Sequence, residues 1–215
     1  MYIDAVPALD LSPEQIVSVA RDLIARDGLD RFSMRRLAAA LEVNPMTIYL
    51  RFENKEALLD AVAAAGLADY EAPAVDGAWA DQVLALAVSL RHHLLADRAT
   101  LRLVADGDRL TAGLLGALDR GLELMAEVTR TPAEAVDAFR ILFWHVVGAA
   151  LVANTFETMP GSRGGLDTAL ADAGERYPHL VAHAPHFGPL DGDDLFLRTT
   201  TQLIAGLRAG QEATS

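Results

Sequence analysis

The stretch "LEVNPMTIYLRFENKEALL", Leu41 to Leu59, decides how the N-terminal part of the chain folds. Asn44 and Pro45 form a helix start, because Asn caps a helix well and Pro suits its first position. A second start follows at Asn54. The segment between them is shorter than a helix that is stable in isolation. The sequence therefore predicts a very short helix that its neighbours must hold in place.

Two longer helices are predicted before this segment. Ser12, Pro13 and Gln15 form a capping box that opens a helix ending near Gly28. Ser33 caps the next helix, and a tight turn joins it to the short one. Three helices in this order are typical of a helix-turn-helix, in which the third helix enters the major groove of DNA. A short helix suffices to contact bases in the groove, but such helices also occur in other all-α proteins. Spacing alone therefore does not decide whether these helices form a helix-turn-helix.

The charge distribution permits DNA binding without demonstrating it. The chain has 18 basic and 30 acidic residues, a net charge of −12, which as a whole disfavours nucleic acid as a partner. The segment 28–60, however, holds as many basic residues as acidic ones, whereas most of the acidic excess lies from residue 61 onward. A phosphate backbone would therefore meet far less repulsion at the N-terminal segment than elsewhere.

The stretch "FSMRRLAAALEVNPMTIYLRFENKEALLDAV", residues 32–62, resembles the tetracycline-repressor family of one-component bacterial transcription regulators. Tyr49, Phe52 and Lys55 match the family's recurring Tyr, Phe and Lys, and "LFLRTTTQLIAGLRA" (195–209) looks like its closing helix. The resemblance implies an all-α protein. Residues 11–56 would form a three-helix DNA-binding domain whose fourth helix links to about residue 70. Residues 78–210 would form a larger helical domain for ligand binding and dimerisation.

The resemblance also implies DNA contacts from the third helix and its flanks. Carried onto this chain, they are Arg35, Asn44, Pro45, Met46, Thr47, Tyr49, Arg51 and Lys55. We also expect Arg36 to clamp the flanking backbone. The chain departs from the family at Glu42, where Gly is usual, and at Arg51, where His is frequent. If residue 42 needs a left-handed backbone, Glu costs on the order of 1 kcal/mol relative to Gly.

A ligand pocket is expected among the helices after residue 78, since pockets combine apolar walls with a few polar groups. The candidate residues are His92, Leu95, Arg102, Leu118, Met125, Phe143, His145 and Asn154. His145 lies among aromatic residues, and a core histidine with one hydrogen bond is the plainer interpretation. The segments 132–157 and 193–209 carry more apolar surface than one stripe, which predicts a four-helix interface in a homodimer. The alternative is that both are buried within one chain.

The "HLVAHAPH" segment, residues 179–186, raises the question of a metal site. His179 and His183 have the spacing of a helical chelate, but Pro178 and Pro185 leave barely one turn, so we expect a loop over the pocket and no metal. The chain contains no cysteine, which excludes disulfides and thiolate chemistry. It also shows no nucleophile motif and no phosphate-binding glycine loop, so we expect neither an enzyme nor a cofactor.

The N-terminus lacks a secretion signal, and the most apolar window, residues 139–154, is judged too short to span a membrane. We therefore expect a soluble cytoplasmic protein without a membrane partner. The function expected from the resemblance is a ligand-responsive transcription regulator, a repressor that a small-molecule effector releases from its operator DNA. The alternatives are a helical enzyme and a protein-interaction module that does not bind DNA.

Overall fold

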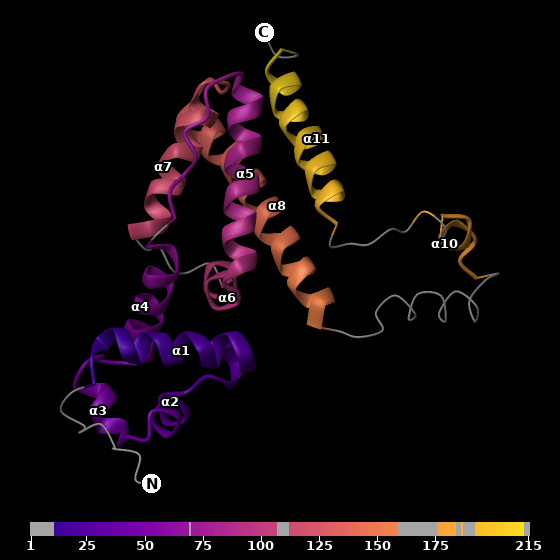
Figure 1. The fold of residues 1–215 in the computed structure, drawn as a ribbon. Coiled ribbons are helices and arrows are strands. Elements are labelled where there is room, and N and C mark those ends of the chain that lie inside the picture. Colours follow the sequence, from indigo (N-terminus) through magenta and orange to yellow (C-terminus); the bar gives the residue numbers. More distant parts are fainter. Residues whose placement is uncertain are drawn as a thin grey trace.

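The computed structural model describes residues 11–68, 70–106, 112–158, 176–183, 186 and 192–212. All regular elements within these ranges are helices, which confirms the predicted all-α fold (Figure 1). The N-terminal elements are α1 (Pro13–Asp27), η1 (Leu29–Arg31), α2 (Met34–Ala40), α3 (Pro45–Tyr49) and α4 (Lys55–Leu67). They are followed by α5 (Trp79–Ala96), α6 (Arg98–Ala105), α7 (Ala112–Ala126), α8 (Pro132–Thr158), α10 (Pro178–His183) and α11 (Asp193–Glu212).

Side-chain caps define where the N-terminal helices begin. Ser12 and Gln15 cap α1 reciprocally, with Ser12 N donating to Gln15 Oε1 at 2.8 Å. Ser33 caps α2, Asn44 caps α3 through a 2.9 Å bond from Met46 N, and Asn54 caps α4. These caps satisfy backbone N–H groups that no helical carbonyl can reach. The predicted helix starts at these positions are therefore confirmed.

The described residues bury two hydrophobic clusters. The first joins α1 to α4 around residues such as Ile16, Leu37, Ile48 and Leu58, and it also takes Leu103 from α6. The second lies among α5, α7, α8 and α11. Helix α6 also contributes to this second cluster, so it belongs to both. The division of the chain at residues 56 and 78 stays a prediction. Helix α4 also contributes to both clusters, with Leu58 in the first and Leu67 in the second, so α4 and α6 both connect the two cores.

Helix α8 corrects one expectation from the sequence. The apolar segment is longer than residues 139–154, because Pro132–Asn154 is long and apolar enough to cross a membrane by length and composition alone. The expectation that this segment is too short to span a membrane is therefore wrong. In the structure α8 packs against α5, α6, α7 and α11, as a core helix of a helical domain does. Only 33% of its most apolar window is buried, so much of its apolar surface faces outward.

The histidine segment is also partly different from expectation. Residues 178–183 form the short helix α10, where a loop was predicted. His183 Nδ1 lies 2.7 Å from the carbonyl oxygen of His179, one helical turn earlier. Both side chains and that of His186 are exposed. The sequence also favours a weaker helix over residues 166–173, which lie outside the described residues.

Candidate DNA interface and effector cavity

Helix α3 presents one face to solvent and anchors the other in the first cluster. Ile48 is fully buried, with 0% of its surface exposed, whereas Met46 is 65% and Tyr49 is 43% exposed. Leu50, just after the helix, is 81% exposed. Thr47 is half-buried. The buried Ile48 therefore anchors α3 in the N-terminal unit formed by α1 to α4, here called the head, while Met46 and Tyr49 extend outward from it.

The turn between α2 and α3 carries backbone strain at the position where the chain departs from the family pattern. Glu42 has φ of 54°, within the left-handed region that favours glycine. The turn is closed by a 3.0 Å hydrogen bond from Val43 N to the carbonyl oxygen of Ala38. The residue does adopt the conformation that was considered from the sequence, so the cost of about 1 kcal/mol applies here.

The cations around α3 differ in how much they are committed to other contacts. Arg35 and Arg51 are exposed. Arg36 donates to Asp27 at 2.7 Å and to the carbonyl oxygen of Arg31 at 3.0 Å. Its guanidinium therefore stabilises contacts within the head. These contacts favour a structural role for Arg36 over the expected contact with the DNA backbone. Lys55 begins α4, where helical N–H groups also favour an anion, and its Nζ lies 5.8 Å from the Phe32 ring centroid. The exposed cations of this region are Arg31, Arg35, Arg36 and Arg51, of which Arg36 is engaged by the contacts above, and Lys55 is half-buried.

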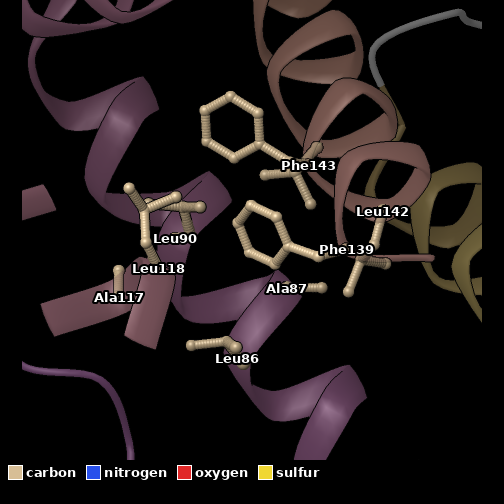
Figure 2. A pocket seen from close by; sticks show the side chains of 9 residues that line it. Leu86, Ala87, Leu90, Ala117, Leu118, Phe139, Leu142 and Phe143 are labelled. Carbon is tan, nitrogen blue, oxygen red and sulfur yellow. The ribbon is translucent and has the colours of Figure 1, made fainter. Parts of the chain in front are cut away.

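The second cluster contains a small cavity between α5, α7 and α8 (Figure 2). It is lined by Leu86, Ala87, Leu90, Ala117, Leu118, Phe139, Leu142, Phe143 and Val146. The rings of Phe139 and Phe143 are stacked, with centroids 5.8 Å apart and planes inclined by 23°. Figure 2 shows both rings reaching from α8 toward Leu86 and Leu90 of α5. The free space is about 20 Å³, room for about one water molecule.

The structure brings only two of the predicted ligand residues, Leu118 and Phe143, to this cavity. Met125 is fully buried in the second cluster and Leu95 is half-buried at its edge. His92 and Arg102 are exposed on α5 and α6. Asn154 is buried, and with Arg102 it lines a separate hollow beside α1 and η1. The remaining candidate, His145, faces α11.

Most of the cavity lining was not predicted from the sequence, since the expected site combined apolar walls with polar groups whereas the observed lining is entirely apolar. Residues 139, 142, 143 and 146 follow the spacing of one helical face, and residues 86, 87 and 90 do so on α5. This apolar periodicity was the available signal. Apolar periodicity identifies which face of a helix is buried, but it does not identify which of the buried residues line a cavity.

His145 has the contacts of a core histidine. Its ring stacks on Phe196, with centroids 5.4 Å apart, and its Nε2 lies 3.0 Å from Thr200 Oγ1. Burial lowers the pKa of His145, so the neutral ring is favoured. Phe196 also packs beneath Arg91, whose Nη1 donates to Asp193 at 2.7 Å. These contacts attach α11 to α5 and α8.

A compact polar junction lies where the head meets α5 and α6. Asp97 is buried and caps α6, and it accepts hydrogen bonds from Thr100 Oγ1 and, at 3.1 Å, from Ala99 N. Arg21 of α1 forms an ion pair with Asp97 at 2.8 Å. Gly66 of α4 lies so close that a Cβ there would overlap Thr100 Oγ1. This junction therefore holds α1 and α4 of the head against α6.

Comparison with known proteins identifies relatives over nearly the whole chain. A sequence profile described as bacterial regulatory proteins of the tetR family matches residues 16–62, and one described as a tetracyclin repressor-like C-terminal domain matches residues 72–210. Tetracycline repressor protein class A from transposon 1721 of Escherichia coli is 34% identical over 158 residues, which cover 72% of this chain and 73% of that protein. The class C repressor of Escherichia coli is 30% identical over 92% of this chain and 90% of its own length.

A solved structure also superposes on the chain. The TetR family protein ActR of Streptomyces coelicolor, in complex with actinorhodin, aligns with a TM-score of 0.77 and 27% sequence identity. The alignment covers 96% of this chain and 99% of the other. The helical arrangement described above is therefore shared across both clusters.

Proposed function

The chain belongs to the tetR family of bacterial regulatory proteins, and on this basis we propose that it is a homodimeric repressor which a small-molecule effector releases from its operator DNA. The family assignment confirms the predicted fold, the function as a DNA-binding transcription regulator and the expectation that the chain is not an enzyme. We place its action in the cytoplasm, where its DNA target lies.

The observation that carries the DNA-binding part of the proposal is the two-faced character of α3. Ile48 is fully buried, whereas Met46 and Tyr49 extend from the opposite face. In our proposal Tyr49 and Thr47 contact phosphates or base edges, and Arg35, Arg51 and Lys55 contact the backbone on either side. Asn44 and Pro45 position the first turn of α3, whose N-terminal residues lead into the groove.

The dimer part of the proposal rests on apolar side chains that α8 and α11 leave exposed. They include Ile141, Trp144 and Val152 of α8 and Leu197 of α11, of which Trp144 is 62% exposed. Soluble monomers rarely expose several large apolar residues together. Pairing of α8 and α11 with the same helices of a second copy would cover them in a four-helix interface with two-fold symmetry.

The effector part of the proposal places the ligand in the cavity between α5, α7 and α8. ActR, which shares this fold, has been solved in complex with actinorhodin. Opening the cavity would move α5 and α7, and α4 packs against both α6 and α7. A shift of α4 changes the distance between the two copies of α3. An effector that favours the wrong distance weakens operator binding, with typical couplings of about 1–3 kcal/mol.

Fluorescence anisotropy with labelled DNA from the region flanking the protein's own gene tests the DNA contacts. We expect specific binding that weakens steeply as salt rises. Tyr49→Ala should lower the affinity, and Lys55→Ala should lower both the affinity and the slope against log salt, by about one unit for one lost phosphate contact. Arg130→Ala, which removes a charge from the surface ion pair with Glu134, is the matched control. Equal affinities for all four proteins would reject this interface, and the absence of specific binding by any of them would favour a protein-interaction module.

A further inference from the structure

The cavity between α5, α7 and α8 has a purely hydrocarbon lining. Its nine residues are Ala, Leu, Val and Phe, and none carries a side-chain hydrogen-bonding group. The polar candidates His92, Arg102, His145 and Asn154 all lie elsewhere on the described part of the chain. Burying a hydroxyl or amide without a partner costs roughly 2–7 kcal/mol, and an isolated charge costs far more. Such a lining therefore selects against polar and charged ligands.

The two aromatic rings fill most of the space between α5, α7 and α8. An apolar cavity that takes one benzene-sized ring has a volume of about 150 Å³, well above the 20 Å³ of free space here. A ligand must therefore displace a side chain. Phe139 and Phe143 are only half-buried, whereas Leu142 and Val146 beside them are buried. The Phe139 ring also lies against Gly121 of α7, where a Cβ would come within 2.5 Å of its Cε2 atom.

We propose that the effector is an uncharged, flat and largely apolar molecule which takes the place of the Phe139 ring against Phe143. The nearly parallel arrangement of the two rings leaves a planar surface on Phe143 once Phe139 turns away. Gly121 provides the space that keeps the Phe139 ring seated while the site is empty. This inference names the ligand class of the site in the proposed function and rests on that function for its regulatory meaning.

Direct binding of matched probes to the full-length protein without DNA tests the ligand class. Naphthalene and naphthoate share a ring system and differ by one carboxylate, and isothermal titration calorimetry measures both. We expect naphthalene to bind and naphthoate to bind weaker by about tenfold or more. Tetracycline, a hydroxyl-rich molecule, should also bind more weakly than naphthalene. Naphthoate or tetracycline binding as tightly as naphthalene would overturn the proposal.

Three variants test the displacement of Phe139. Phe139→Ala removes the ring that the ligand must move, so naphthalene affinity should rise severalfold. Gly121→Ala places a methyl group in the space that the ligand would take over from that ring and should lower the affinity, while Leu115→Ala, at an exposed position of α7, should leave it unchanged. Weaker binding to the Phe139→Ala variant would overturn the displacement. This comparison stands even if Gly121→Ala fails to fold.

A parallel measurement of operator affinity separates this inference from the proposed function. If naphthalene binds but leaves operator affinity unchanged, the ligand class is supported and the regulatory switch is rejected. If tetracycline releases the operator while naphthalene does not bind, the switch is supported and the ligand class is overturned.

Discussion

Replacing Gly66 by alanine tests the polar junction between the head and α6. Glycine inside a helix normally destabilises it, so Gly→Ala on α4 should by itself stabilise the protein by up to about 1 kcal/mol. The structure predicts the opposite sign. A methyl group at residue 66 would overlap Thr100 Oγ1 and lie 2.8 Å from Oδ2 of Asp97. Thr100 would have to turn away and release its hydrogen bond to the buried Asp97 carboxylate.

The magnitude follows from these two effects. Overpacking a tight contact costs about 1–3 kcal/mol, and losing a hydrogen bond to a charged group costs about 1.5–3 kcal/mol. We therefore expect Gly66→Ala to lower the free energy of unfolding by about 2–5 kcal/mol. Thr100→Ala alone loses only the hydrogen bond. In the double variant the overlap with Oγ1 is gone and the hydrogen bond is lost only once. Its total cost should therefore fall short of the sum of the two single costs by at least about 1.5–3 kcal/mol, the cost of that hydrogen bond.

Urea unfolding followed by far-UV circular dichroism, at one fixed protein concentration, measures all four corners of this cycle. Gly116→Ala on α7 is the matched control, because a Cβ there meets no atom within 4 Å. The control should stabilise the protein slightly. If Gly66→Ala stabilised it by the same amount, or if the costs of Gly66→Ala and Thr100→Ala added fully, then α4 would not pack against α6 as described.

Three further predictions concern the head and the buried histidine. Glu42→Gly removes the strain of a left-handed backbone but increases the conformational entropy of the unfolded chain. Urea unfolding should therefore show a net stabilisation of at most about 1 kcal/mol. Glu42→Ala should give no stabilisation, because alanine is strained in the same conformation. Ile48→Ala should destabilise the protein by about 2–5 kcal/mol, whereas Leu50→Ala, at an exposed position, should change its stability by less than about 0.5 kcal/mol. Similar losses of unfolding free energy in the two variants would mean that Ile48 is not the anchor of α3. Burial lowers the pKa of His145, so the unfolded state takes up its proton first as the pH falls through about 6.5. The stability of the protein should therefore decrease below that pH, and the decrease should be smaller for His145→Gln in thermal melts across this pH range. If the pH dependence of the variant matched that of the unchanged protein, His145 would not be the group responsible.

Local chemistry explains why the head could be predicted from the sequence. The caps at Ser12, Asn44 and Asn54 act within three residues of themselves, so the sequence contains both partners of each interaction. The left-handed backbone at Glu42 could be anticipated for a similar reason, because the related family usually has glycine at this single position. The short α3 then follows from two adjacent helix starts.

Contacts between distant parts of the chain explain what the sequence analysis missed. The partner of His145 is Thr200, on a different helix, and the partner of Arg36 is Asp27 on α1. Neither pairing has a local signal. The polar side chains that seemed suited to a ligand site are used in such contacts or face solvent, whereas the cavity is lined by residues that resemble any buried helical face.

The most direct test of the account is the distance between the two copies of α3 in the operator complex. The chain has no cysteine, so Leu50→Cys provides a single site for a spin label at the exposed end of α3 in each protomer. Pulsed electron paramagnetic resonance on the complex with operator DNA should give one narrow distribution close to 34–36 Å, the spacing of successive major grooves, or a multiple of it. The absence of a dipolar signal, or a separation that fits no such spacing, would contradict a dimer that reads DNA with α3.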